Sequence, residues 1–377
     1  QHWQSINVWY SARAVGQRGP VTRIASGCAA AEAGKIAAEW LEIDPSGTFR
    51  AHFAPAGALR GGTYKYSNKP SGLYHWLTTA RPPPFVDSSR GIVVLIDPDQ
   101  MLLRPITAAL GAGLRPSPRK GELVDADGVP RVLGHNLDGI APRVAPGVAA
   151  GQEYGLGGAW GDAGKPTAGK SWRSFDRGRV CGDGPCSRTT VREAAQSYAV
   201  GPPYVIHARD AVPLAKAWLR AVPDVHSQYP YLLAEMYAYS MAAANLSLPH
   251  AQVHHLMVSN AQAGGEGWDW VDSVPREQIC GGAADSTPPL ATRFDASLPF
   301  SNDVHPPGPA APAVVHFCQR YPAGGQKFGK HSVPHNAFSC DGGVFAFDAG
   351  KAAAAAIGAG SREAVRNAYV LCNVLPR

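Results

Sequence analysis

The stretch that most constrains the fold is GIVVLIDPDQMLLRPI, at residues 91–106. It begins with a short run of β-branched and other apolar residues, Gly91–Ile96, and then changes abruptly to Asp97-Pro98-Asp99. A continuous apolar run of this length predicts a strand that is covered on both faces, like the strands of a parallel sheet. Such sheets occur in α/β proteins, where helices supply the covering layers.

Other segments of the chain have weaker hydrophobic patterns that are typical of strands or of helices. They predict strands at 21–24, 204–207 and 314–317, and helices at 29–41, 72–79, 211–222, 231–246 and 362–371. This alternation predicts an α/β fold with a mostly parallel sheet flanked by helices. Because no linker divides the chain, we expect a single domain over residues 1–377, with long Gly/Pro-rich loop insertions at about 107–190 and 261–312.

Composition excludes several classes of protein. The chain has 377 residues, 45% of them hydrophobic, which is enough for a substantial core. Its formal charge of +6 comes from 35 basic and 29 acidic residues, with no block of five basic residues, and no RNA-binding motif is present. Nucleic acid is therefore not an expected partner. No apolar stretch approaches the ~20 residues that span a membrane, and no GxSxG, Walker A, HExxH or Rossmann glycine motif occurs.

The cysteines and one N-glycosylation sequon indicate the cellular compartment of the protein. Seven cysteines are present without any CxxC pair, so their spacing fits no zinc site. Cys181 and Cys186 bracket the turn sequence GDGP and predict a small local disulfide, and Cys318 and Cys340 are further disulfide candidates. Asn245 begins the one N-glycosylation sequon. These features favour the secretory pathway (the lumen of the ER or Golgi) or an extracellular location.

Asp97 and Asp99 are the first candidates for chemistry. In open α/β sheets, ligands bind beyond the carboxyl ends of the strands, which is where this strand places its two carboxylates. Their spacing of two lets both approach one cation, and Mg²⁺ or Mn²⁺ prefers such oxygen ligands while keeping open positions for phosphate. The alternative is a polar turn that ends the strand.

His316 and Glu235 are the next candidates. His316 ends a second apolar strand, VVHF, and its imidazole can complete a divalent-metal site begun by the two aspartates. The alternative is a histidine that is hydrogen-bonded in the core. Glu235 lies in YLLAEMYAYSMAAANL among mostly apolar neighbours, where a carboxylate needs a partner or a cleft. It is a candidate general base or acceptor-binding group, and alternatively a structural hydrogen-bonding group.

Aromatic and basic residues add weaker candidates. Tyr237 and Tyr239 fit core packing as well as ligand stacking, and together with His207 they are candidates for binding an acceptor. For His207 the same alternative applies as for His316. Lys69 and Lys330 are candidates for neutralising a diphosphate, and alternatively surface charges.

Six segments occur in an order that resembles a known family. They are PVTRIASG, NKPSGLYHWL, VVLIDPDQMLLRPI, GPPYVIHARDAVPLAKAWL, LLAEMYAYSMAAANL and VVHFCQRY. The set resembles the hydroxyproline O-arabinosyltransferases and peptidyl serine α-galactosyltransferases of plants and green algae. The serine-galactosyltransferase branch is the more similar through PVTR, NKPSGLYHWL and HFCQRY. The resemblance covers roughly residues 3 to 345.

The resemblance implies a GT-A-type glycosyltransferase with a Rossmann-like domain. It implies a UDP-sugar donor, Mn²⁺ (or Mg²⁺) held by Asp97 and Asp99, and an acceptor peptide that is rich in hydroxyproline, as extensins are. His316 matches the family's late metal-ligand histidine and Glu235 its glutamate. Lys69 and Trp76 fall in the NKP…HW segment, and Lys330 falls near the basic residue after the late strand, so these three are expected to bind the donor.

One departure from the family keeps a second function open. Family members have a hydrophobic first strand before a Trp-Gln pair, whereas here Trp3-Gln4 stands at the start and that strand is missing before Gln1. A sheet without this strand has an open edge through which copies of the chain can associate. The alternative to an enzyme is therefore a non-catalytic, extracellular structural or assembly subunit.

Overall fold

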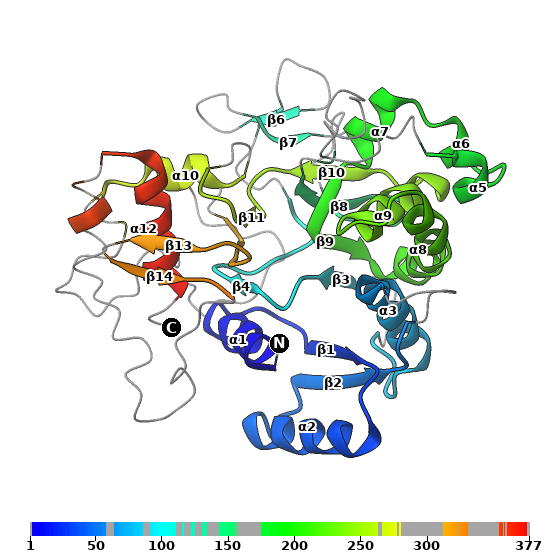
Figure 1. Cartoon of the computed structure of the whole chain (residues 1–377), viewed down its shortest axis with the longest axis horizontal. Coiled ribbons are helices and arrows are strands. Elements are labelled where there is room, and N and C mark those ends of the chain that lie inside the picture. Colours follow the sequence, from blue (N-terminus) through cyan, green and yellow to red (C-terminus); the bar gives the residue numbers. More distant parts are fainter. Residues whose placement is uncertain are drawn as a thin grey trace. The chain divides into compact units, whose positions relative to one another are not determined.

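The computed structural model of the chain describes its residues in several ranges. They are 2–57, 64–85, 91–110, 115–116, 122–124, 130–133, 143–154, 156, 175–262, 266–276, 279, 312–323, 325–330, 354–356, 358 and 360–374. The chain gathers into two compact units (Figure 1). Unit 1 comprises residues 1–18, 96–106 and 254–377, and unit 2 comprises residues 19–95 and 107–253. Each unit has its own buried hydrophobic cluster. The expectation of a single domain stays a prediction.

The main sheet belongs to unit 2. Its seven strands lie in the order β3-β9-β8-β10-β7-β6-β5. Their bounds are Ile92–Leu95 (β3), Val200–His207 (β9), Ala149–Glu153 (β8), His250–Val253 (β10), Pro130–Leu133 (β7), Glu122–Val124 (β6) and Arg115–Pro116 (β5). Only β8 and β10 pair in parallel, and the other five pairings are antiparallel. The α/β class is confirmed, but the expectation of a mostly parallel sheet is wrong, because β3 pairs antiparallel with β9.

Two helices of unit 2 pack against each other beside this sheet. They are α8, Ala208–Gln228, and α9, Ala234–Asn245, whose residues 234–244 are all buried (Figure 1). Trp218 of α8 donates a hydrogen bond from Nε1 to the Glu235 carbonyl at 2.7 Å, which fixes one helix to the other. Around them lie the short helices α5 (Arg177–Cys181), α6 (Pro185–Arg188) and α7 (Val191–Ser197). The core of unit 2 therefore centres on the helix that the sequence marks most clearly.

A smaller layer of unit 2 is built on the parallel pair β1 (Val21–Ser26) and β2 (Phe49–Ala54). Trp40 of α2 (Ala30–Ile43) stacks on Phe49 with ring centroids 4.1 Å apart. The 3₁₀ turn η1 (Lys65–Ser67) leads into α3 (Asn68–Thr79). A Cβ at Gly72 of α3 would lie 2.7 Å from Ile24 Cγ2, so glycine allows the helix to approach the strand closely.

Unit 1 holds the three-stranded sheet β11-β12-β4. Its strands are Met257–Val258 (β11), Val314–His316 (β12) and Gln100–Leu102 (β4). The unit also contains the hairpin β13–β14 (Tyr321–Ala323 and Gln326–Phe328) and helices α10 (Trp268–Ser273) and α12 (Arg362–Val374). Arg366 joins the two helices through a paired ion contact with Asp272, whose shorter N–O distance is 2.7 Å.

Helix α1, His2–Ala14, is a feature that the sequence analysis did not predict. It packs along β4, where Ser11 Oγ accepts a hydrogen bond from the Leu102 N–H at 3.1 Å. Trp3 stacks on Phe317 with ring centroids 5.7 Å apart. The Trp3-Gln4 pair thus lies in a helix that accepts a backbone hydrogen bond from the edge strand β4.

The predicted local disulfide is confirmed, since Cys181 and Cys186 are bonded. Cys318 carries a free thiol, so its candidate role in a disulfide is not seen, and Cys340 lies outside the described residues. Asn245 ends α9, with its side-chain oxygen buried against Gly184 of the disulfide loop. No helix within the described ranges is long and apolar enough to cross a membrane.

Candidate metal centre

A tight turn positions the two aspartates. The Gln100 N–H donates to the Asp97 carbonyl at 3.1 Å, and the Gln100 side-chain oxygen accepts from the Asp97 N–H at 3.1 Å. Pro98 stands second in the turn, where its fixed φ is favoured. Gln100 itself is fully buried and donates from Nε2 to Met257 Sδ at 3.5 Å. The turn is therefore anchored in the small sheet of unit 1.

Strand pairing brings His316 to the same place. β12 runs antiparallel to β4 with His316 opposite Gln100, and the Phe317 N–H donates to the Asp99 carbonyl at 3.0 Å. His316 Nε2 consequently lies 3.3 Å from Asp99 Oδ1. The predicted position of His316 at the end of an apolar strand is confirmed.

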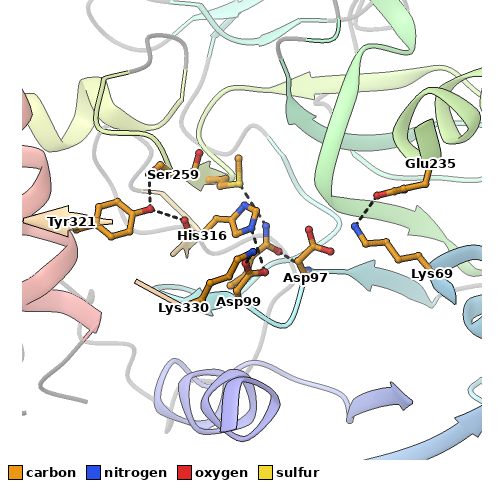
Figure 2. A network of polar contacts seen from close by, with 10 residues as sticks. Lys69, Asp97, Asp99, Glu235, Ser259, His316, Tyr321 and Lys330 are labelled. Carbon is orange, nitrogen blue, oxygen red and sulfur yellow. Dashed lines mark hydrogen bonds and ion pairs between the residues drawn. The ribbon is translucent and has the colours of Figure 1, made fainter. Parts of the chain in front are cut away.

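Asp97, Asp99 and His316 form one group of potential ligands (Figure 2). One ligand atom of each lies within 4.8 Å of those of the other two. A cation with ligand distances of about 2.1 Å holds its ligands about 3 to 4 Å apart, so small side-chain movements bring the three into range. Two carboxylate oxygens and an imidazole nitrogen suit a divalent cation and leave open positions for further oxygen ligands. The three residues fit a divalent cation.

The site is strongly polarised. Burial disfavours the Asp99 carboxylate, but the hydrogen bonds and charges of His316 and Lys330 outweigh burial and lower the pKa of Asp99 well below its usual value. Burial also opposes the charged form of His316, yet its contacts with Asp99 and with the Cys318 side chain raise the pKa of His316 to about 10. Cationic groups thus compensate the charge of the Asp99 carboxylate.

Lys330 is the second cation at Asp99. Its Nζ lies 2.7 Å from Asp99 Oδ2, and the Lys330 side chain is 31% exposed while that of Asp99 is 8% exposed. Burial lowers the pKa of Lys330, but its hydrogen bond and attraction to Asp99 dominate and raise it. The two oxygens of Asp99 therefore face two different cationic side chains, His316 and Lys330.

Three residues behind His316 were missed in the sequence. Tyr321 donates its hydroxyl to the carbonyls of Ser259, at 2.5 Å, and His316, at 2.7 Å (Figure 2). Glu266 accepts hydrogen bonds from the Ser259 N–H and, at 2.6 Å, from the Ser259 hydroxyl, and burial raises the pKa of Glu266 above its usual value. These contacts hold the end of β12. The bond between Tyr321 and Ser259 joins residues 62 positions apart, so no local pattern could reveal it.

Glu235 and Lys69 make an ion pair within unit 2. Lys69 Nζ lies 2.8 Å from Glu235 Oε1, and the side chains are 28% and 4% exposed (Figure 2). The Glu235 N–H donates to the Tyr64 hydroxyl at 3.0 Å, and that hydroxyl donates to the Leu232 carbonyl at 3.0 Å. The buried carboxylate therefore has the partner that its apolar surroundings require. A catalytic role for Glu235 and a donor-binding role for Lys69 stay predictions.

The aromatic and histidine candidates of unit 2 lie in or against its buried core. Tyr237 and Tyr239 are 0% exposed in the core, and the Tyr239 hydroxyl shares a hydrogen bond of 2.8 Å with His250 Nε2. These positions agree with core packing, and a role in acceptor binding stays a prediction. His207 is buried, and its Nδ1 caps α8 by accepting from the Arg209 N–H at 3.2 Å. Trp76 of α3 is partly buried against the core cluster of unit 2. Its expected contact with a donor stays a prediction.

Comparison of the chain with models of known protein families, with curated proteins and with solved structures found no match in any of the three. The candidate function therefore depends on the geometry of the Asp97–Asp99–His316 group and on the order of the sequence motifs.

Proposed function

We propose that the protein is a divalent-cation-dependent glycosyltransferase that transfers a sugar from a UDP-sugar. The observation that carries the proposal is the convergence of Asp97, Asp99 and His316 from two separate segments of unit 1. A protein with a purely structural role would gain nothing from placing two carboxylates and an imidazole together where burial disfavours charge.

The residues present suit a phosphate-bearing donor. Asp97, Asp99 and His316 would hold the cation, and a bound Mn²⁺ supplies Lewis-acid stabilisation of the departing diphosphate. Lys330, which lies beside Asp99 and is partly exposed, would contribute a second positive charge to the diphosphate oxygens. Tyr321 and Ser259 would keep the backbone of His316 in place, so that its ring stays directed at the cation.

The sequence motifs support the class of donor and acceptor. Their order resembles that of transferases that glycosylate hydroxyproline or serine, which favours a hydroxyproline-rich peptide as the acceptor. The Cys181–Cys186 disulfide supports an oxidising compartment, as expected for a protein of the secretory pathway.

Turnover of UDP-sugars tests the proposal. The protein would be incubated with Mn²⁺, a panel of UDP-sugars and a hydroxyproline-rich peptide, and release of UDP and glycosylated peptide would be measured. We expect activity that Asp97→Asn abolishes and that Asp269→Asn, an exposed acid of α10 in the same unit, leaves unchanged. Absence of UDP release with every sugar, with or without peptide, would favour the alternative of a non-catalytic assembly subunit, whose self-association light scattering would detect.

A further inference from the structure

Lys330 has a fixed backbone and a long side chain. It follows β14 by two residues, and its N–H donates to the Phe317 carbonyl at 3.4 Å. The preceding Gly329 packs so closely that a Cβ there would lie 2.5 Å from the Gln319 carbonyl oxygen. The backbone of Lys330 is thus held against the segment that follows His316. Its partly exposed side chain, with four methylene groups, can still redirect the ammonium group.

In its observed position the ammonium group competes with a metal ion. Lys330 Nζ lies 2.7 Å from Asp99 Oδ2, and Asp99 is one of the three residues that converge as metal ligands. A divalent cation bound to Asp99 would stand within about 4–5 Å of that ammonium group, where like charges repel each other strongly in a poorly hydrated site. The ion pair and the metal complex therefore oppose each other.

We propose that Lys330 is a tethered counter-cation of Asp99, which leaves when the divalent cation binds and then pairs with the diphosphate that arrives with the cation. This rests on the proposed function, and it assigns to Lys330 a positioning and selectivity role. Free cation is disfavoured because it displaces the Lys330 ammonium group from the Asp99 carboxylate into solvent. Cation together with diphosphate is favoured because the displaced ammonium finds a new anion. The site thereby prefers the cation–diphosphate pair to the cation alone.

A binding cycle on the full chain tests this inference. Isothermal titration calorimetry would give the Kd of Mn²⁺ with and without saturating UDP, for the wild type and for Lys330→Met. In the wild type we expect UDP to tighten Mn²⁺ binding about tenfold or more, within the usual range of coupling between sites. In Lys330→Met we expect Mn²⁺ alone to bind several-fold tighter than in the wild type, and the tightening by UDP to be largely lost.

Two further variants separate a positioning role from loss of structure. Lys330→Arg keeps the charge and should retain the coupling, and Lys327→Met, an exposed lysine of the same hairpin, should behave as the wild type. Thermal unfolding of each variant would show that it is folded. Unchanged or weaker binding of Mn²⁺ alone to Lys330→Met, or coupling to UDP equal to that of the wild type, would overturn the inference while leaving the metal site intact. No Mn²⁺ binding to any of the four proteins would overturn the proposed function as well.

Discussion

The ion pair of Lys69 and Glu235 allows the role of the buried carboxylate to be measured. Glu235 is only 4% exposed, and its Oε1 lies 2.8 Å from Lys69 Nζ. The perturbation is a double-mutant cycle of Lys69→Met, Glu235→Gln and the double variant. If the carboxylate stabilises unit 2 through Lys69, each single change should cost more in the wild-type background than in the presence of the other change.

The size of the expected coupling free energy follows from the distance between the two charges and from their burial. Two unit charges about 3 Å apart attract by about 5–6 kcal/mol at an effective dielectric constant near 20, and desolvation of a buried carboxylate offsets much of this. We therefore expect a coupling free energy of about 2 kcal/mol, equivalent to roughly 4–8 °C in Tm for a unit of this size. Arg179 and Asp224 supply a matched control, with the same N–O distance of 2.8 Å but exposures of 54% and 35%. Their coupling should stay below about 1 kcal/mol.

Urea unfolding followed by circular dichroism, with differential scanning calorimetry, would give the four free energies of each cycle. A coupling of Lys69 and Glu235 no larger than that of Arg179 and Asp224 would refute the assignment of a stabilising buried pair. The buried carboxylate of Glu235 would then need another explanation, such as the predicted catalysis.

Two more outcomes are expected for unit 2. Replacing Cys181 and Cys186 together by alanine should destabilise it by about 2 kcal/mol, because the bond closes a short loop (sequence separation 5) in the unfolded chain, and equal stability of the two proteins in urea would contradict this. Burial lowers the pKa of His250 from 6.5 to about 4, so between these values the unfolded chain binds a proton that the folded one does not. Stability should therefore fall by about 3 kcal/mol as the pH drops from about 6.5 to 4. His250→Gln should flatten this pH dependence, and an unchanged slope in calorimetric scans would argue against it.

Local patterns predicted the elements that carry their own signal. Gly91–Ile96 and Tyr231–Leu246 are a β-branched run and a long apolar segment of helix formers, and the structure has β3 and α9 within them. The direction in which strands pair leaves no such signal in the local sequence, because the partner of β3 lies more than a hundred residues away in β9. The assumption that a buried strand belongs to a parallel sheet therefore failed. Helix α1 was missed because its polar and apolar residues show no clear helical face, and packing on β4 stabilises it.

Some contacts of the candidate site could likewise be predicted from local patterns, and others could not. Asp97, Asp99 and His316 stood out because each follows or ends an apolar strand, and strand pairing brings them together. The pairing of Lys330 with Asp99 joins residues that are 231 positions apart, so it depends entirely on the tertiary fold. Tyr237 and Tyr239 show the limit of a local pattern, since their aromatic rings fit a ligand or a core equally well in the sequence, and their full burial is seen only in the fold.

Direct binding of Mn²⁺ tests the central claim most simply. Electron paramagnetic resonance measures the free Mn²⁺ that remains in a titration, so the number of sites and their Kd follow without any assay of activity. We predict one site in the wild type, with affinity reduced at least about tenfold by Asp97→Asn or Asp99→Asn, since each removes a carboxylate ligand. Asp269→Asn should bind as the wild type does. Equal binding by all four proteins, or none by the wild type at millimolar Mn²⁺, would contradict a metal centre at Asp97, Asp99 and His316.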